Sequence, residues 1–271
     1  MFDQDARTIQ RIAPLLQRVL ILDPDPAGAT AIGEMMRRIG RPEVTVEASN
    51  AKALKACGRT DPQVIVVELS GEAVDGVAFT QALRRSDLAC RKAPVILVTG
   101  EATAGAILAA RDAGVHEFLR RPFTVRDLVR RLDAAILRPR TWVEAVAYVG
   151  PDRRRFNSGD YKGPLKRHAD IEAVEDFARI GQALKILRSA IGAIDQDPAQ
   201  ALRAMRAQAS ELQTAAGAIA DTRLETAAGA LQRYLSESAG AGERLHAAEL
   251  ERRAAPLLAQ APRYMDDRVA A

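Results

Sequence analysis

The sequence predicts two different folds in succession, an α/β domain with a doubly wound parallel sheet and then an all-α helical bundle. First, the run Val64–Leu69 opens with four consecutive β-branched residues, which suits a strand covered on both faces. Second, strand-like and helix-like segments alternate five times over residues 18–138. Third, apolar residues after position 170 recur at spacings of three and four, which is typical of packed helices.

Each strand-like segment is apolar and is followed by a helix-like segment with its own start signals. Pro26 fits the first position of the first helix, with Asp25 as its N-cap and Gly40 as its end. We expect Asn50 to cap the second helix and Thr124 the last. The predicted strands are 18–22, 44–48, 64–69, 94–99 and 115–119, and the predicted helices are 26–39, 50–58, 77–85, 102–113 and 124–137.

Four regions follow from these patterns. They are an N-terminal helical extension (1–17), the α/β domain (18–138), a basic linker rich in Gly-Pro steps (139–170) and the helical bundle (171–265). The first residues lack the basic and then apolar pattern of a signal peptide, and no apolar run reaches the length of a membrane span. We therefore expect a cytoplasmic protein that does not insert into membranes.

The net charge of +4 is concentrated in one segment. Residues 151–168 carry six Lys or Arg side chains against two Asp, a difference of four. Because Phe156 and Tyr161 lie among the cations, the segment could contact phosphates and stack on bases, or it could be a solvated arm. The basic residues are Arg153, Arg154, Arg155, Lys162, Lys166 and Arg167.

Several landmarks of the α/β domain follow in a specific order. Acidic residues come after the first strand, a carboxylate ends the third, and Asp75-Gly76 follows it. Pro94 and Thr99 bound the fourth strand, and Arg121-Pro122-Phe123 follows the fifth. In this order, residues 18–138 resemble the receiver domain of bacterial response regulators. The resemblance implies a flavodoxin-like fold with strand order 2-1-3-4-5.

The resemblance also implies a phosphotransfer site, which needs an Asp nucleophile, two acidic ligands for Mg²⁺, a hydroxyl and a Lys. The sequence departs from this pattern at three positions. Asp23 matches the first acid, but Pro24 takes the place of the second. Glu68 stands at the nucleophile position and Arg121 at the Lys position. We expect Asp25 to turn toward the helix that it caps, and we expect no Mg²⁺ site or other cofactor.

Glu68 has one methylene more than Asp, and in-line attack tolerates little displacement. Its carboxylate supplies a permanent charge of −1, which Arg121 could grip with a bidentate fork. Thr99 keeps the hydroxyl position, and Phe118 keeps the position of the switch aromatic. The alternatives are a solvated strand end for Glu68, an exposed side chain for Arg121 and plain core for Phe118.

The segment Leu212–Leu224 is similar to the stretch after the active histidine of histidine-phosphotransfer (Hpt) domains. In that alignment the histidine position holds Ser210, which cannot form a phosphoramidate. Gln213 and Thr214 replace the usual Lys and Gly. The alternative is an unrelated helical bundle or a dimerisation stalk.

The leading hypothesis is a non-catalytic adaptor, a phosphorylation-independent pseudo-receiver in a phosphorelay. Its partners would be a histidine kinase, a receiver, a phosphotransfer protein or a second copy of the chain. One alternative is a residual phosphoacceptor that acts as a phosphate sink, and another is nucleic-acid binding through the basic linker. We expect no enzyme, since the sequence shows no Ser/His/Asp or His/Cys cluster at usable spacing.

Overall fold

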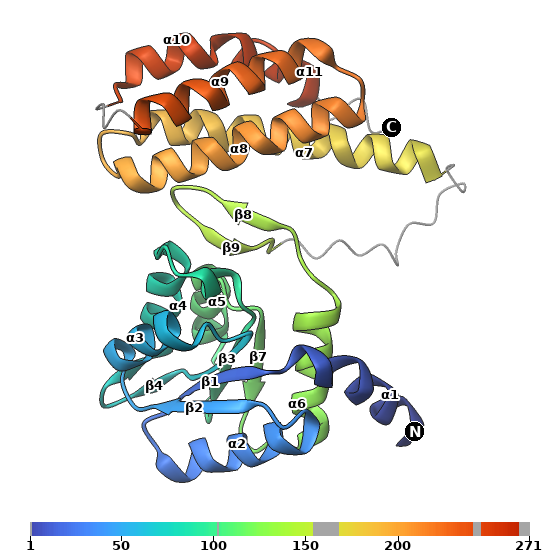
Figure 1. The fold of residues 1–271 in the computed structure, drawn as a ribbon, viewed down its shortest axis with the longest axis vertical. Helices are drawn as coiled ribbons and strands as arrows, with labels where there is room; N and C mark the ends of the chain where they lie inside the picture. Colours follow the sequence, from blue (N-terminus) through green and yellow to red (C-terminus); the bar gives the residue numbers. More distant parts are fainter. Residues whose placement is uncertain (1, 102, 154–167, 241–244, 266–271) are drawn as a thin grey trace. The chain divides into compact units, whose positions relative to one another are not determined.

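The computed structural model describes residues 2–101, 103–153, 168–240 and 245–265. The chain divides into two compact units, one of residues 1–143 with 148–155 and one of residues 144–147 with 156–271. The first unit contains a five-stranded parallel sheet, and the second contains long helices (Figure 1).

All pairs of neighbouring strands in this sheet are parallel, in the order β2-β1-β3-β6-β7. This is the order 2-1-3-4-5 of the predicted flavodoxin-like fold, which is therefore confirmed. The fifth strand runs later than predicted and ends at Arg120. The strands are β1 (Arg18–Leu22), β2 (Glu43–Glu47), β3 (Val64–Glu68), β6 (Val95–Thr99) and β7 (Glu117–Arg120).

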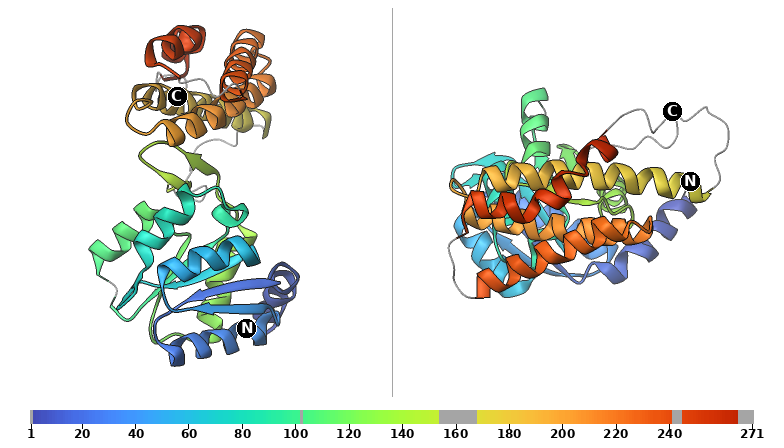
Figure 2. Two further views of the ribbon diagram at one scale, coloured as in Figure 1. Left: turned by 60° about the vertical axis from the view of Figure 1, so that its left-hand side comes forward. Right: turned by 90° about the horizontal axis from the view of Figure 1, so that it is seen from above.

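Helices cover both faces of the sheet (Figure 2). Successive side chains of β3 point to opposite faces, so Val64 and Val66 enter one buried cluster while Ile65 and Val67 enter the other. This explains why the strand is apolar at every position. The helices are α1 (Phe2–Ile12), α2 (Pro26–Ile39), α3 (Asn50–Thr60), α4 (Gly76–Arg85), α5 (Ala104–Ala113) and α6 (Val125–Leu132).

The helix caps agree with the prediction at Asp25 and Thr124, whose side chains accept backbone N–H groups of α2 and α6. The prediction for Asn50 is wrong, since Ser49 is the N-cap residue of α3. Asn50 instead exchanges two hydrogen bonds with the backbone of Asp75. Smaller elements are η1 (Ala13–Leu15), β4 (Ser70–Gly71), β5 (Val74–Asp75), η2 (Ala89–Lys92), a π-helix η3 (Asp133–Leu137), β8 (Trp142–Glu144) and β9 (Val149–Pro151).

A buried arginine organises one end of the first unit. The Arg84 side chain is 1% exposed, and it donates hydrogen bonds to the carbonyl oxygens of Gly114, Arg91 and Ala93. Its guanidinium carbon also lies 5.4 Å from the ring centroid of Trp142. Among the described residues, 139–143 and 148–153 thus group with the first unit, although they fall within the linker predicted from the sequence.

Five helices form most of the described part of the second unit, which confirms the predicted helical region. α7 packs on α8, α8 on α9, α9 on α10 and α10 on α7, so four helices close a ring (Figures 1 and 2). The Asp197 side chain caps α8, and α10 continues two residues past Pro256. The helices are α7 (His168–Gly192), α8 (Pro198–Ala218), α9 (Thr222–Gly240), α10 (Ala247–Leu258) and α11 (Ala261–Met265).

The short helix α11 is fixed by one carboxylate at the start of α9. The Tyr264 hydroxyl donates to Asp221 Oδ2 at 2.5 Å, and Arg263 Nη1 donates to the same oxygen at 2.9 Å. The hydrogen bond from Tyr264 is the main cause that lowers the pKa of Asp221. Burial and this hydrogen bond raise the pKa of Tyr264 to about 12.

Candidate functional site

Three charged side chains meet at the carboxyl edge of the sheet. Asp23 directly follows β1, Glu68 ends β3 and Arg121 directly follows β7. Carboxyl ends of parallel strands lie at one edge, which is where open α/β sheets place their sites. The sheet therefore brings together residues that are far apart in the sequence.

Arg121 bridges the two carboxylates. Its Nη2 atom lies 2.6 Å from Asp23 Oδ2 and 3.0 Å from Glu68 Oε2, and its Nε atom lies 3.2 Å from the same Glu68 oxygen. The Asp23 side chain is 3% exposed, the Glu68 side chain 13% and the Arg121 side chain 30%. We call this group the Arg121 clamp: one cation held between two largely buried anions.

The remaining oxygens of the site also have donors within the chain. Asp23 Oδ1 accepts the Asp25 amide at 2.9 Å, and Glu68 Oε1 accepts the Leu69 amide at 3.2 Å. Asp25 turns toward α2, where its two oxygens accept the amides of Ala27 and Gly28. Each of the six oxygens of these three carboxylates thus has a hydrogen-bond donor.

Burial and charge act on Glu68 in opposite directions. Burial raises the pKa of Glu68 above its ordinary value, whereas the charge and hydrogen bonds of Arg121 lower it. The charge of Asp23 adds a smaller rise. The balance is a raised pKa, so the clamp only partly compensates the cost of holding this carboxylate in its site.

Thr99 and Phe118 lie apart from the clamp's hydrogen bonds. The Thr99 side chain is 3% exposed, and its hydroxyl donates to the Glu101 carbonyl and accepts the Glu101 amide, each at 3.1 Å. Phe118 is half-buried and packs against the cluster under α3 and α4. Thr99 is therefore used within its own turn, and Phe118 contributes to the core.

Two residues next to the clamp, Gly28 and Pro24, have close contacts that were not predicted from the sequence. A Cβ atom on Gly28 would lie 2.9 Å from Asp23 Oδ2 and 3.0 Å from Arg121 Nη1, so an alanine there would force the clamp side chains to shift. Pro24 lies directly against Gly71, where an added Cβ would collide with the proline ring. A glycine in the first turn of a helix that starts beside the site was the available signal for Gly28.

The receiver resemblance implies Mg²⁺, and the donor set here does not fit it. Mg²⁺ prefers near-octahedral oxygen ligation with one or two carboxylates. Pro24 offers no side-chain oxygen, Asp25 caps α2, and the Arg121 guanidinium lies between Asp23 and Glu68. Over the described ranges, no group of three or more His, Cys, Asp or Glu is placed to hold a metal ion.

Of the linker's basic residues that were predicted to contact phosphates, only Arg153 is among the described residues. It forms an ion pair with Asp112, and its guanidinium carbon lies 3.8 Å from the ring centroid of Tyr148. The other predicted phosphate-binding residues, Arg154, Arg155, Lys166 and Arg167, lie outside the described residues.

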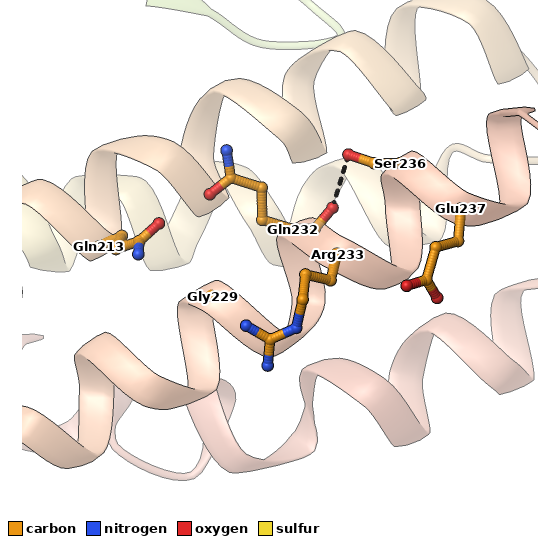
Figure 3. A pocket seen from close by; sticks show the side chains of 6 residues that line it. All are labelled: Gln213, Gly229, Gln232, Arg233, Ser236 and Glu237. Atoms are coloured by element: carbon orange, nitrogen blue, oxygen red, sulfur yellow. Dashed lines mark hydrogen bonds between the residues drawn. The ribbon is translucent and has the colours of Figure 1, made fainter.

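In the second unit, Ser210 is exposed on α8, and its carbonyl accepts the Thr214 hydroxyl at 3.0 Å. A nearby groove of about 360 Å³ lies between α8 and α9 and is lined by polar side chains and Gly229 (Figure 3). Gln213 lines this groove, but Ser210 does not. Across the described helices, none is long and apolar enough to cross a lipid bilayer.

Residues 19–133 match the family model of the response regulator receiver domain. The transcriptional regulatory protein PrrA of Mycobacterium leprae is 30% identical over 121 residues, which are 45% of this chain and 50% of that protein. The response regulator PleD of Caulobacter vibrioides is 30% identical over 130 residues, covering 48% of this chain and 28% of PleD. The chain thus spans about half the length of the first of these relatives.

One solved structure with a related sequence is the receiver domain of the sensor histidine kinase PA1611 from Pseudomonas aeruginosa, with a magnesium ion coordinated in its active site cleft. It is 28% identical, with a TM-score of 0.41, and the match covers 44% of this chain and 97% of that structure. The family match shows a receiver domain in the first unit and links it to two-component signalling. It leaves the helical region unassigned.

Proposed function

We propose that the receiver domain of this chain works without phosphorylation, as an interaction module in two-component signalling. The observation that carries this proposal is the Arg121 clamp, in which one guanidinium binds Asp23 and Glu68. A phosphoryl group would have to enter a site whose carboxylate oxygens already have donors. The clamp gives the site a fixed charge pattern that needs no phosphoryl group and no metal ion.

The chemistry of phosphotransfer supports the same proposal. A carboxylate nucleophile needs a free oxygen in line with the phosphorus atom, and a displacement of about 1 Å can cost roughly 10²-fold in rate. Glu68 Oε2 faces the guanidinium, and Oε1 accepts a backbone amide. We therefore propose that the domain is neither a phosphotransfer enzyme nor a Mg²⁺ protein.

An interaction role does not need the lost chemistry. Protein interfaces depend on shape and on a few buried anchors, and the receiver fold is complete in this chain. We propose a histidine kinase, a receiver or a phosphotransfer protein as the partner. The helical region would serve the same role without accepting a phosphoryl group, because Ser210 cannot form a phosphoramidate.

Labelling with radioactive acetyl phosphate and Mg²⁺ tests the proposal. We expect no label on the wild type or on Glu68→Gln. The matched positive control is the triple variant Pro24→Asp/Glu68→Asp/Arg121→Lys, which restores the receiver pattern and should gain label. A label on the wild type that Glu68→Gln removes would contradict the proposal and favour the phosphate sink.

Partner binding tests the second half of the proposal. Proteins captured by the full chain from a cell extract are identified, and their affinities are measured with and without acetyl phosphate and Mg²⁺. We expect the same affinity in both conditions and a weaker interaction for Glu68→Ala, because that variant leaves the guanidinium of Arg121 with one anion. An affinity that depends on the phosphoryl donor would contradict the proposal.

A further inference from the structure

Among the described residues of the second unit, one segment lies far in the sequence from the helices that it contacts. Residues 144–147 (Glu-Ala-Val-Ala) group with the helices, although they precede α7 by about twenty positions in the sequence. The Glu144 side chain is buried, Val146 packs against the helical core and Ala147 is exposed. This segment, which joins β8 to β9 and bends at residues 146 and 147, thus occupies a place on the surface of the helical unit.

Two buried glutamines of α8 hold this segment. Gln200 Nε2 donates to Glu144 Oε1 at 3.0 Å and to the Ala145 carbonyl at 3.2 Å. Gln208 Nε2 donates to the Glu144 carbonyl at 3.0 Å. Eight residues apart, the two glutamines lie on one face of the helix, so two consecutive carbonyls and one carboxylate are recognised together.

The side-chain amides of Gln200 and Gln208 are buried, and the orientation of one of them is fixed by a neighbouring side chain. The Gln200 side chain is 1% exposed and the Gln208 side chain 6%, and buried polar groups need partners. Arg203 Nε donates to Gln200 Oε1 at 3.2 Å and thereby sets which end of that amide faces the segment. Both glutamines stand among buried alanines and Met205 of this helix, so their amides depend on polar partners outside the apolar core.

These contacts do not depend on a covalent link between the segment and α8. Hydrogen bonds to the main chain of a peptide, together with a pocket for one side chain, are an established way for a protein to bind a peptide. We propose that α8 carries a peptide-binding site, occupied here by the chain's own residues 144–146. The site takes a bent protein segment in which Glu is followed by a small and then a β-branched apolar residue.

The chain's own segment then competes with any partner that offers the same pattern. A tethered ligand acts at an effective concentration of roughly millimolar, so the intact chain should bind a free peptide weakly. Substitutions that weaken the contacts of residues 144–146 with α8 should leave the site free to bind an added peptide. This inference does not rest on the Arg121 clamp and can fail or succeed independently of the proposed function.

The test uses the full chain and a fluorescein-labelled peptide of residues 143–147 (Val-Glu-Ala-Val-Ala). Fluorescence anisotropy compares the wild type with Glu144→Ala/Val146→Ala, in which the tethered segment is weakened. We expect the variant to bind at least tenfold more tightly than the wild type. A peptide with alanine at the positions of Glu144 and Val146 is the control and should bind neither chain.

The matched site variant adds Gln200→Leu/Gln208→Leu to Glu144→Ala/Val146→Ala. We expect it to lose at least tenfold in affinity for the peptide. No saturable binding by the opened chain, or binding that the two leucines leave unchanged, would overturn the proposal.

Hydrogen exchange on the wild type keeps the proposal testable if the opened chain does not fold. With excess peptide, the amides of residues 144–147 should exchange at least threefold faster while α8 stays protected. Unchanged exchange would mean that the segment is a permanent part of the helical unit, and it would overturn the proposal.

Discussion

Replacing Arg121 by glutamine removes the cation of the clamp and leaves both anions in place. Asp23 and Glu68 then face each other with side chains that are 3% and 13% exposed. Removing one partner of a buried ion pair costs more than the pair contributes, because the remaining charge is uncompensated. We therefore expect Arg121→Gln to destabilise the first unit.

The distances set the magnitude of this effect. At an effective dielectric constant near 20, a charge separation of 2.6 Å to Asp23 corresponds to about 6 kcal/mol of Coulomb attraction. The contact of 3.0 Å to Glu68 gives a similar value. Desolvation offsets much of this, and the Arg121 side chain is 30% exposed, so we expect a net loss of about 2–4 kcal/mol at pH 8.

The loss of stability caused by Arg121→Gln should depend on pH. The pKa of Glu68 is raised above its ordinary value of 4.5, so the folded state binds this proton more tightly than the unfolded state. Tighter proton binding by Glu68 stabilises the folded state below pH 4.5, and this stabilisation is lost as the pH rises through the pKa of Glu68 in the folded state. Arg121→Gln removes a cause that lowers this pKa, so the loss should be larger at pH 8 than at pH 5.

Urea denaturation followed by tryptophan fluorescence measures this effect. Trp142 is the only tryptophan and belongs to the first unit, so its signal reports the relevant transition. Arg120→Gln, which changes the exposed neighbour, is the matched control and should cost at most about 0.5 kcal/mol. A loss below about 1 kcal/mol at pH 8, or an equal loss at pH 5, would refute the electrostatic reasoning.

Three further predictions concern stability; the two in the first unit use the same urea assay, and the third, in the second unit, uses urea denaturation followed by circular dichroism of the helices. Gly28→Ala should cost about 1–2 kcal/mol, because the new methyl group displaces the clamp; an unchanged midpoint would show that the clamp can shift freely. Arg84→Met should cost about 3–5 kcal/mol, since it leaves buried carbonyls without donors, and Arg84→Lys should recover little of it. Tyr264→Phe should cost about 1–2 kcal/mol by removing the hydrogen bond to Asp221. Because the folded pKa of Asp221 is lowered, its stabilisation is present above its ordinary pKa of 3.8 and lost as the pH falls through the folded value. The Tyr264→Phe difference should therefore shrink in acid, and a difference that is constant with pH would contradict this assignment.

The sheet and much of the site could be predicted because they depend on local patterns. The apolar run Val64–Val67 and the Asp25 cap each act through neighbours in the sequence. The strand order and the pairing of Glu68 with Arg121 were predicted from the resemblance to receiver domains. Asp23 was predicted as the first acid of the receiver pattern, but its ion pair with Arg121 was not predicted.

Other features depend on contacts between residues far apart in the chain, which produce no repeating pattern in the sequence. Arg84 lies in a predicted helix and has the composition of a surface residue, yet its acceptors come from residues 91, 93 and 114. The strand β8 is only three residues long, and its Trp142 side chain packs beside cations of α4 and η2. The partners of Gln200 and Gln208 are 56 and 64 positions away. Such pairings become visible only once the chain is folded.

The clamp cation is covalently part of the polypeptide, and this determines how long the charged site persists. A metal ion can be chelated and an acyl phosphate hydrolyses, so sites built on them have a lifetime. The guanidinium between Asp23 and Glu68 is present in every folded copy from the moment of synthesis. Under the proposed function, the strength of the signal would follow how much of the protein the cell makes and degrades.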